Sequence, residues 1–355
     1  MRPWLRTVIP STIAALALVA PGAQALAAPI APTTSVNATF GAWCELSGYT
    51  DPGLELALTQ TTRSGVTKAV YEVVGNNTDG FWFTECKGLA STDRLIITTR
   101  PDGLPVRTVR IPMMSTNIDR ATDTVTGVVR GNRAPSLIVT PCDAWNCVDG
   151  NGLTLAPDAN GSFSTATPMP VDGRDLLALY AVRGDDEYQR MQAAPTLRVF
   201  LGHAGVSGTA QRPGAEVTVT VTRGARVATF KGTARRDGQF SGKLQRRNGT
   251  PFKLAAGDRV TSSIASDLDF VVPASATITG SAVSGTCFAG QQVVVSAVAP
   301  DKSFSGVTHL TAGGDGSFSI DLTDLLLRTV TPGIIVSVEC DPGEGDTVLI
   351  REVVP

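Results

Sequence analysis

A short turn motif recurs four times along the chain at nearly constant spacing. Each copy has Asp or Asn, then Gly, then an aromatic residue two positions after the glycine: Asp79-Gly80-Phe81-Trp82, Asn160-Gly161-Ser162-Phe163, Asp237-Gly238-Gln239-Phe240 and Asp315-Gly316-Ser317-Phe318. The four glycines are 77 to 81 residues apart. Because Asp-Gly and Asn-Gly readily adopt the positive φ of a tight turn, each copy predicts a turn into a strand that buries its aromatic side chain. The spacing predicts one building block repeated along the chain.

Two further markers accompany each turn in the same order. Ser-Gly or Thr-Gly lies 30 to 36 residues before the turn glycine, as in Val206-Ser207-Gly208. A polar step into another strand follows the turn, as in Gly257-Asp258-Arg259-Val260. Between the markers, Val217-Thr218-Val219-Thr220-Val221-Thr222 alternates with the period of two that is typical of a half-buried strand. The Leu-rich segment 175–183 could form a helix, but its place in the repeat favours a strand. Segment 321–327 is expected to contain a single helical turn.

The markers divide the chain into four modules, at 35–114, 115–202, 203–273 and 274–355. The 355 residues include 36 Gly and 22 Pro, whereas aromatic residues make up only 6%, so many turns and short strands are expected. Hydrophobic residues make up 42%, which is enough to bury several cores. We therefore predict an all-β fold of four tandem antiparallel sandwiches, each of about seven strands.

The order of these markers resembles bacterial immunoglobulin-like repeats. It comprises an aliphatic-Ser/Thr-Gly step, Pro-Gly before an alternating strand (Pro52-Gly53 and Pro213-Gly214), the Asp-Gly-x-Phe turn, and Gly-Asp-x-Val. The first module departs from this order with Trp82-Phe83 after its turn, and the second lacks Pro-Gly. The resemblance implies immunoglobulin-like sandwiches that serve as stalks, spacers or adhesion modules of secreted and cell-surface proteins. The Ala-rich composition and the excess of Arg over Lys favour an actinobacterial source.

The N-terminus has the order of a secretory signal peptide. Arg2 and Arg6 precede the apolar run 13–20, Pro21-Gly22 interrupts it, and small residues lead to a cleavage site near Ala27. The alternative, an uncleaved membrane anchor, is disfavoured because the run is shorter than the ~20 residues of a spanning helix. Residues 1–27 are thus expected to be removed, leaving a secreted, extracellular chain without a transmembrane segment, free or held at the cell surface by another molecule.

Six cysteines and no odd thiol fit an oxidising compartment. Six cysteines allow 15 pairings. Because the module boundaries leave two cysteines in each of three modules, we expect the disulfides Cys44–Cys86, Cys142–Cys147 and Cys287–Cys340. Zinc is the competing interpretation, but no histidine lies near a cysteine pair.

Two features suggest partner contacts. Trp145 lies on the short loop that Cys142 and Cys147 would close, although it could equally fold back over its own module. The third module has a net charge of +6, from eleven Lys and Arg against five Asp and Glu, and its candidate contacts are Arg235, Arg236, Arg246 and Arg247. These could bind an anionic cell-wall polymer, a glycan or an extracellular protein, or could simply be solvated strand faces that oppose aggregation. The overall net charge of −2 argues against nucleic acid.

Catalysis finds no support in the sequence. The chain has only two histidines, no Gly-x-Ser-x-Gly motif and no expected free cysteine. Segment 158–161 matches only part of a calcium loop, so no metal or cofactor is expected.

The leading hypothesis is a monomeric, non-catalytic binding or spacer protein. One alternative is a small-molecule carrier, because the second module is faintly similar to the secreted apoproteins of actinomycete chromoproteins. Another is a structural subunit of a surface assembly.

Overall fold

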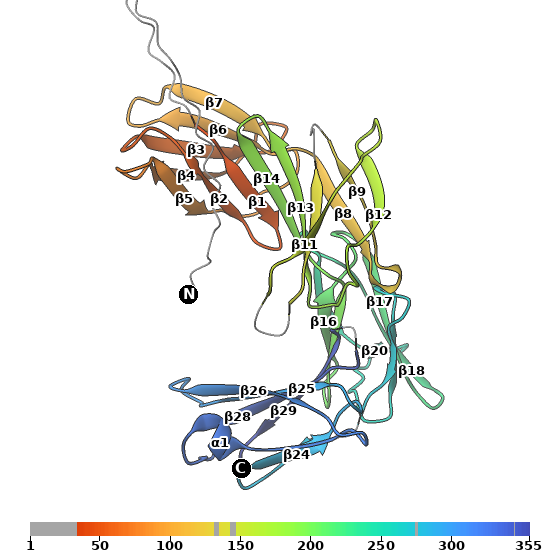
Figure 1. Ribbon diagram of the computed structural model, residues 1–355. Coiled ribbons are helices and arrows are strands. Elements are labelled where there is room, and N and C mark those ends of the chain that lie inside the picture. The colour runs from red at the N-terminus through yellow and green to blue at the C-terminus, as the bar shows by residue number, and fades with distance from the viewer. Residues whose placement is uncertain (1–33, 131–134, 143–146, 274–275, 344) are drawn as a thin grey trace, which may run out of the picture. The chain divides into compact units, whose positions relative to one another are not determined.

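A computed structural model describes residues 34–130, 135–142, 147–273, 276–343 and 345–355; the expected signal peptide and Trp145 lie outside these ranges. The described chain is almost entirely β-structure in six sheets, which confirms the all-β prediction (Figure 1). Within it, the helical elements are the 3₁₀ turn η1 (Arg120–Thr122) and the short helix α1 (Leu322–Leu326). Helix α1 lies where the sequence predicts a single helical turn, and the Asp321 side chain accepts a hydrogen bond from the Thr323 amide at its start.

Residues up to 194 form a first half built from three sheets. Its sheets have the strand orders β11-β10-β13-β14-β1-β2-β5, β4-β3-β6-β7 and β12-β9-β8. The strands are β1 (Asn37–Gly41), β2 (Glu45–Tyr49), β3 (Glu55–Thr61), β4 (Thr67–Val74), β5 (Phe81–Glu85), β6 (Arg94–Thr99), β7 (Pro105–Arg110), β8 (Met114–Asp119), β9 (Thr124–Val129), β10 (Ser136–Thr140), β11 (Asn151–Thr154), β12 (Ser162–Ala166), β13 (Leu176–Arg183) and β14 (Asp186–Ala193).

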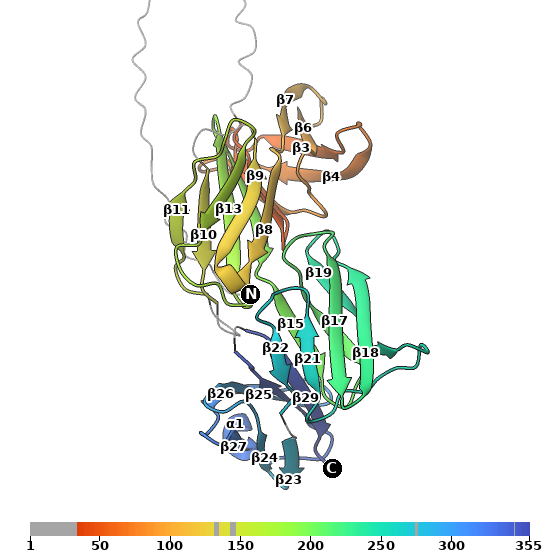
Figure 2. The ribbon, with the colours of Figure 1, turned by 90° about the vertical axis from the view of Figure 1, so that its right-hand side faces the viewer.

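Residues from 196 onward form a second half with a similar plan. Its sheets have the orders β19-β16-β15-β29-β28-β25-β26, β20-β18-β17-β21-β22 and β23-β24-β27 (Figure 2). The strands are β15 (Thr196–Phe200), β16 (Gly205–Thr209), β17 (Glu216–Arg223), β18 (Arg226–Thr233), β19 (Gln239–Lys243), β20 (Gln245–Arg246), β21 (Arg259–Ser262), β22 (Asp269–Val271), β23 (Ala276–Thr279), β24 (Ala282–Thr286), β25 (Gln292–Val298), β26 (Ser305–Thr311), β27 (Ser317–Asp321), β28 (Ile335–Cys340) and β29 (Thr347–Val353).

In each half, the first strand pairs in parallel with the last strand. β1 lies beside β14 with Asn37 opposite Glu187, and β15 lies beside β29 with Arg198 opposite Thr347. The other pairs of described strands are antiparallel. The buried side chains follow the same division, with one cluster from Val36 to Ala194 and another from Leu197 to Val354. Each half is therefore joined by a continuous sheet and a continuous core.

We propose that the strands divide into four sandwiches, two in each half. Sandwich 1 comprises β1–β7, sandwich 2 β8–β14, sandwich 3 β15–β22 and sandwich 4 β23–β29. Each then combines a three-stranded group, such as β1-β2-β5, with a group of four or five strands, such as β4-β3-β6-β7. β15 (Thr196–Phe200) pairs with β16, so the boundary expected between residues 202 and 203 falls inside a hairpin. The pairing moves that boundary to a position before Thr196.

The repeated turn motif has the conformation that its sequence predicts. The four turn glycines have φ between +73° and +83°. In three copies the aspartate before the glycine accepts a hydrogen bond from the amide after it, as Asp237 Oδ1 does from Gln239 N at 3.0 Å. The aromatic side chains that follow are buried in all four copies: Trp82, Phe163, Phe240 and Phe318. Segment 175–183 also confirms its prediction, because it contains strand β13.

The disulfides join the pairs expected from the sequence. They are Cys44–Cys86, Cys142–Cys147 and Cys287–Cys340, and the described residues contain no free cysteine. Cys44–Cys86 and Cys287–Cys340 span 42 and 53 residues. Closing loops of this length removes disorder from the unfolded chain and stabilises the fold by about 3–4 kcal/mol each in the entropic model.

Two equivalent aspartates hold the parallel strand pairs. Asp186 Oδ1 accepts the amide of Val36 at 3.0 Å, just before β1. Asp346 Oδ1 accepts the amide of Leu197 at 2.7 Å, at the matching position of β15. Both aspartates are buried, and each also binds an arginine, Arg107 and Arg120 respectively. A buried carboxylate between an amide and a guanidinium is satisfied on both sides, so it fixes where the first strand docks.

Arg120 and Arg174 of sandwich 2 reach acidic residues of sandwich 4. Arg120 binds Asp346 through both terminal nitrogens, at 3.3 and 2.9 Å, and donates to the Pro195 carbonyl at 3.0 Å. Arg174 pairs with Asp341 at 2.6 Å. Arginine–aspartate pairs, including these two, therefore connect the two halves of the chain.

Gly345 of the second half packs against residues 172–174 of the first half, and replacing it with Ala should destabilise the protein by about 2–4 kcal/mol. A Cβ at Gly345 would lie 2.0 Å from Asp172 Oδ1 and 2.8 Å from two backbone nitrogens. Gly343 is a matched control, because it also has positive φ but no atom within 4 Å of its added Cβ. Gly343→Ala should cost only about 1 kcal/mol, the strain of the backbone alone. Urea unfolding of both variants measures the difference, and equal losses would contradict the close contact.

Candidate functional site: an arginine-lined cleft

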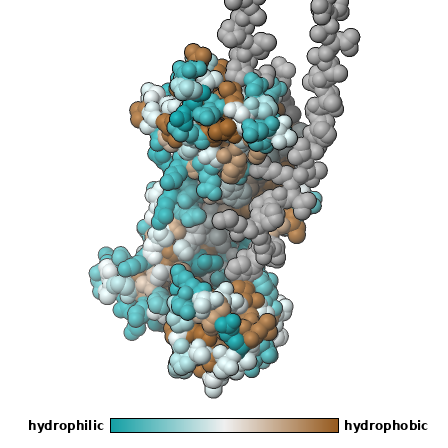
Figure 3. All heavy atoms as spheres, turned by 90° about the vertical axis from the view of Figure 1, so that its left-hand side faces the viewer, coloured by the Kyte–Doolittle hydropathy of each residue, from teal (hydrophilic) through white to brown (hydrophobic). Residues whose placement is uncertain are grey.

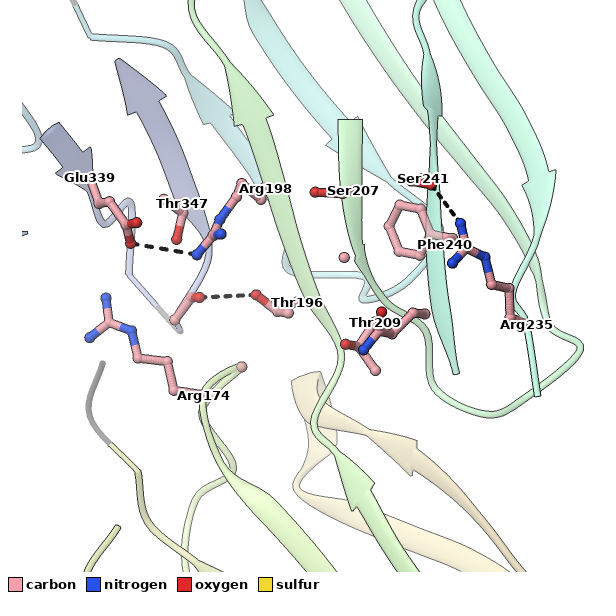
Figure 4. A pocket seen from close by; sticks show the side chains of 14 residues that line it. Arg174, Thr196, Arg198, Ser207, Thr209, Arg235, Phe240, Ser241, Glu339 and Thr347 are labelled. Atoms are coloured by element: carbon pink, nitrogen blue, oxygen red, sulfur yellow. Dashed lines mark hydrogen bonds and ion pairs between the residues drawn. The ribbon is translucent and has the colours of Figure 1, made fainter. Parts of the chain in front are cut away.

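A cleft of about 620 Å³ lies over the seven-stranded sheet of the second half (Figure 4). Its floor comes from β19, β16, β15 and β29, and Gly173 and Arg174 of sandwich 2 form part of its wall. The lining residues share a polar or charged character, apart from three glycines and Phe240: Gly173, Arg174, Thr196, Arg198, Ser207, Gly208, Thr209, Arg235, Gln239, Phe240, Ser241, Glu339, Gly345 and Thr347. Residues of sandwiches 2, 3 and 4 thus meet at one site.

The strand alternation explains why the floor is rich in hydroxyl groups. Leu197 and Val199 of β15 point into the core, which turns Thr196 and Arg198 to the opposite face. The register continues this row across the sheet, because Arg198 lies opposite Ser207 on one side and Thr347 on the other, and Ser207 lies opposite Ser241. Neighbouring strands are about 4.8 Å apart, so a ligand lying across the strands meets a polar side chain at each step.

The three arginines of the cleft are held to different degrees. Arg174 is held by Asp341 at 2.6 Å and by the Gln292 side chain at 2.5 Å, so its main role is to form part of the wall of the cleft. Arg198 has Glu339 at 3.6 Å, which is longer than a charge-assisted hydrogen bond. Arg235 donates to Ser241 Oγ at 3.1 Å, and no acidic side chain of the described residues forms an ion pair with it. Two guanidinium groups therefore keep hydrogen-bonding capacity for a ligand.

Acidic groups behind the wall are perturbed by burial. Loss of hydration raises the pKa of Asp341, although the nearby Arg174 opposes this shift. Burial also raises the pKa of Asp346 to about 6, because the lost hydration outweighs its hydrogen bonds from Arg120 and Leu197. Burial raises the pKa of Asp175 as well, which accepts amides of Asp172 and Cys142. These carboxyls support the wall, whereas the floor presents guanidinium and hydroxyl groups.

The arginines proposed from the sequence do not form one patch. Arg235 lines the cleft, whereas Arg236 is exposed beside it and is not part of the lining. Arg246 lies opposite Ala228 near the start of β18 and stacks over Phe252 at 5.5 Å, with the exposed Arg247 next to it. Seven residues separate Ala228 from Arg235, which corresponds to about 20 Å along a strand. Trp145 lies outside the described residues, so its contact role stays a prediction.

Sequence reasoning missed Arg174, Arg198 and Glu339. One signal was present: in Thr196-Leu197-Arg198-Val199 the arginine occupies the outward position of an alternating strand. No sequence signal placed Arg198 beside Glu339, because their contact depends on the parallel pairing of β15 with β29 and on β28 beyond it.

A metal site gains no observation in its favour, whereas the carrier alternative keeps a cleft of about 920 Å³ in sandwich 2, lined by Val129, Arg130, Pro135 and segment 155–161. Among the described residues, no group of three or more His, Cys, Asp or Glu side chains could hold a metal ion. Asp158 Oδ1 accepts the amides of Asn160 and Ser162, both at 2.8 Å, so it shapes its own turn. In sandwich 2, buried side chains such as Val125 and Leu179 occupy the interior.

Comparisons with known proteins do not identify a relative. No family model matches the sequence, and no curated protein is similar to it. The tetra-tandem repeat of the extending region of a large adhesion protein is 18% identical, covering 91% of this chain and 100% of that chain, with a TM-score of 0.19. The BSP domain of a biofilm-associated protein is 10% identical over 88% and 92% of the two chains, with a TM-score of 0.18. The α2-macroglobulin of Escherichia coli is 10% identical over 91% of this chain and 28% of that chain, also with a TM-score of 0.18.

The part of the chain that the structure describes contains no helix of the length and apolar character needed to cross a lipid bilayer.

Proposed function

We propose that this protein is a secreted, non-catalytic binding and spacer protein that holds an anionic extracellular polymer in the arginine-lined cleft. The observation that carries the proposal is the cleft itself, whose floor offers Arg198, Arg235 and a row of hydroxyl groups. Guanidinium groups bind anions, and hydroxyl groups both donate and accept hydrogen bonds. The residues that line the cleft offer mainly guanidinium and hydroxyl groups, and this chemistry supports binding.

The proposed location outside the cell has two supports. Three disulfides fit an oxidising compartment, and residues 1–27 have the order of a signal peptide. An actinobacterial source remains part of this proposal. On the face seen in Figure 3, hydrophobic groups are interrupted by hydrophilic residues, as on a protein whose surface is largely in water.

The spacer role rests on the shared sheets and the buried pairs. β1–β14 and β15–β29 tie the sandwiches within each half, while Arg120–Asp346 and Arg174–Asp341 connect the halves. Connections of this kind hold successive sandwiches in fixed register, unlike flexible linkers.

A salt titration of polymer binding tests the proposed function. The protein, exported with its own leader, should bind immobilised acidic polysaccharide and purified anionic cell-wall polymer but not neutral dextran. The affinity should fall by at least about tenfold between about 0.05 and 0.5 M NaCl, because salt screens partly exposed charges. Absence of binding to every anionic polymer at low salt would contradict the proposal. So would release of shortened chains from the bound polymer, which would indicate catalysis.

A further inference from the structure

We propose that the cleft recognises the carboxylate of an acidic sugar unit, which takes the place of Glu339 at the Arg198 guanidinium. This inference rests on the proposed function and names the ligand class of the same site. The juxtaposition that carries it is Glu339, on β28, facing Arg198, on β15, at the edge of a hydroxyl-lined floor (Figure 4).

Glu339 is a replaceable partner for Arg198. Their closest nitrogen–oxygen distance is 3.6 Å, and both side chains are partly exposed, at 46% for Arg198 and 30% for Glu339. A hydrogen-bonded guanidinium–carboxylate pair has about 2.7–2.9 Å between nitrogen and oxygen. Since partly exposed pairs contribute little, a ligand carboxylate that binds Arg198 through both oxygens loses little by displacing Glu339. The Glu339 carboxylate shows that a planar carboxyl group can face this guanidinium.

Arg235 supplies a second contact on the opposite side of the floor. Its guanidinium donates to Ser241 Oγ from the turn before β19, and β19 lies two strands away from β15. Two strand steps correspond to about 10 Å, so Arg198 and Arg235 can contact different parts of one oligosaccharide. Ser207 lies between them in the row and offers a hydroxyl group to the ligand.

The floor favours an acidic sugar over a neutral one. Recognition of neutral sugars by ring stacking needs an exposed aromatic face, but the Phe240 ring is buried beneath the floor. Apart from the Gln239 amide and the Glu339 carboxylate that the ligand displaces, the remaining polar contacts are guanidinium and hydroxyl groups, which match carboxylate and sugar hydroxyls. A planar carboxylate accepts both hydrogen bonds of an arginine fork, which a lysine cannot provide.

The substitution Glu339→Gln is the first test, with polygalacturonate as the carboxylated probe. Removal of the internal competitor should raise the affinity about threefold, the effect of a weak exposed pair. Glu352→Gln changes the net charge equally on the exposed end of β29, so it controls for general electrostatic attraction. Its affinity should stay within about 1.5-fold of the wild type. Equal gains in the two variants, or no gain in Glu339→Gln, would overturn the role of Glu339.

Arginine variants provide the second test. The double variant Arg198→Gln/Arg235→Gln should lose at least about tenfold in affinity for polygalacturonate, whereas Arg226→Gln/Arg247→Gln, with the same net charge, should lose less than about threefold. Circular dichroism and urea unfolding check that each variant is folded. If the wild type binds polygalacturonate in a salt-sensitive way but both double variants bind equally, the inference fails and the proposed function stands. If the wild type binds no anionic polymer, both fail.

Arg198→Lys separates carboxylate geometry from charge. This variant keeps the positive charge but loses the fork, so its affinity for polygalacturonate should fall by at least about fivefold. Its affinity for dextran sulfate, whose sulfate esters present the same charge with a different shape, should change less than about twofold. Equal losses for the two polymers would overturn the assignment to a carboxylate.

Discussion

Replacing Arg120 with Met should lower the free energy of unfolding by about 3–5 kcal/mol near neutral pH. Arg120 and Asp346 are both only 3% exposed, and Arg120 binds Asp346 through two nitrogens. Methionine fills much of the volume of the arginine stem but leaves the Asp346 carboxylate without its cation in a site that excludes water. A buried charge without a partner costs far more than the intact pair contributes. Urea unfolding at about pH 7.5 measures the loss.

Two variants make this prediction specific. Arg259→Met removes the exposed Arg259–Asp269 pair and should lower the free energy of unfolding far less than Arg120→Met does, because solvent screens this pair. In the double variant Arg120→Met/Asp346→Asn, the asparagine oxygen can still accept the Leu197 amide, but no uncompensated charge remains. The double variant should therefore recover at least about half of the loss. If Arg120→Met and Arg259→Met lose equal stability, the buried pair does not connect the halves as described.

The sequence predicted the local structure well because local structure depends on short-range chemistry. The Asp-Gly turns, the alternating strand at 217–222 and the aromatic residues after each turn need only their neighbours, and the structure confirms them. The disulfide pairing was predicted from the same division of the chain into modules. The predicted count of four modules remains a proposal, with its third member beginning at β15 rather than after residue 202.

The joining of sandwiches into halves could not be predicted, because it depends on contacts about 150 residues apart. Val36 and Asp186 form one such contact, and Leu197 and Asp346 form its equivalent. Val36 and Leu197 are 161 residues apart, and the two aspartates 160, so the same contact recurs at nearly constant spacing in the sequence. A single buried aspartate in each copy is too weak a signal to find beside the turn motif. The cleft was missed for the same reason, since sandwiches 2, 3 and 4 contribute to it.

Stability should fall as the pH rises through about 6, and Asp346 is the main cause. Burial raises its pKa to about 6 in the folded protein, from an ordinary value of 3.8. The folded state therefore holds this proton more tightly than the unfolded state does. The contribution of Asp346 to the free energy of unfolding is greatest below pH 3.8 and is lost as the pH rises to about 6. A shift of this size corresponds to a loss of about 3 kcal/mol when integrated over pH. The raised pKa values of Asp341 and Asp175 act in the same direction.

The substitution Asp346→Asn isolates this contribution from other titrating groups. Exposed carboxyls such as Asp301, whose pKa is lowered by hydrogen bonds from Ser303, act in the opposite direction in both proteins. Around Asp346 the charged neighbours are Arg120, Asp267 and Asp341, and all remain in the variant. Urea unfolding of wild type and Asp346→Asn at about pH 4.5 and 7.5 should therefore show a decrease with pH that is about 2 kcal/mol larger in the wild type. Parallel pH profiles would mean that Asp346 ionises as readily in the folded protein as in the unfolded chain, and that burial does not raise its pKa.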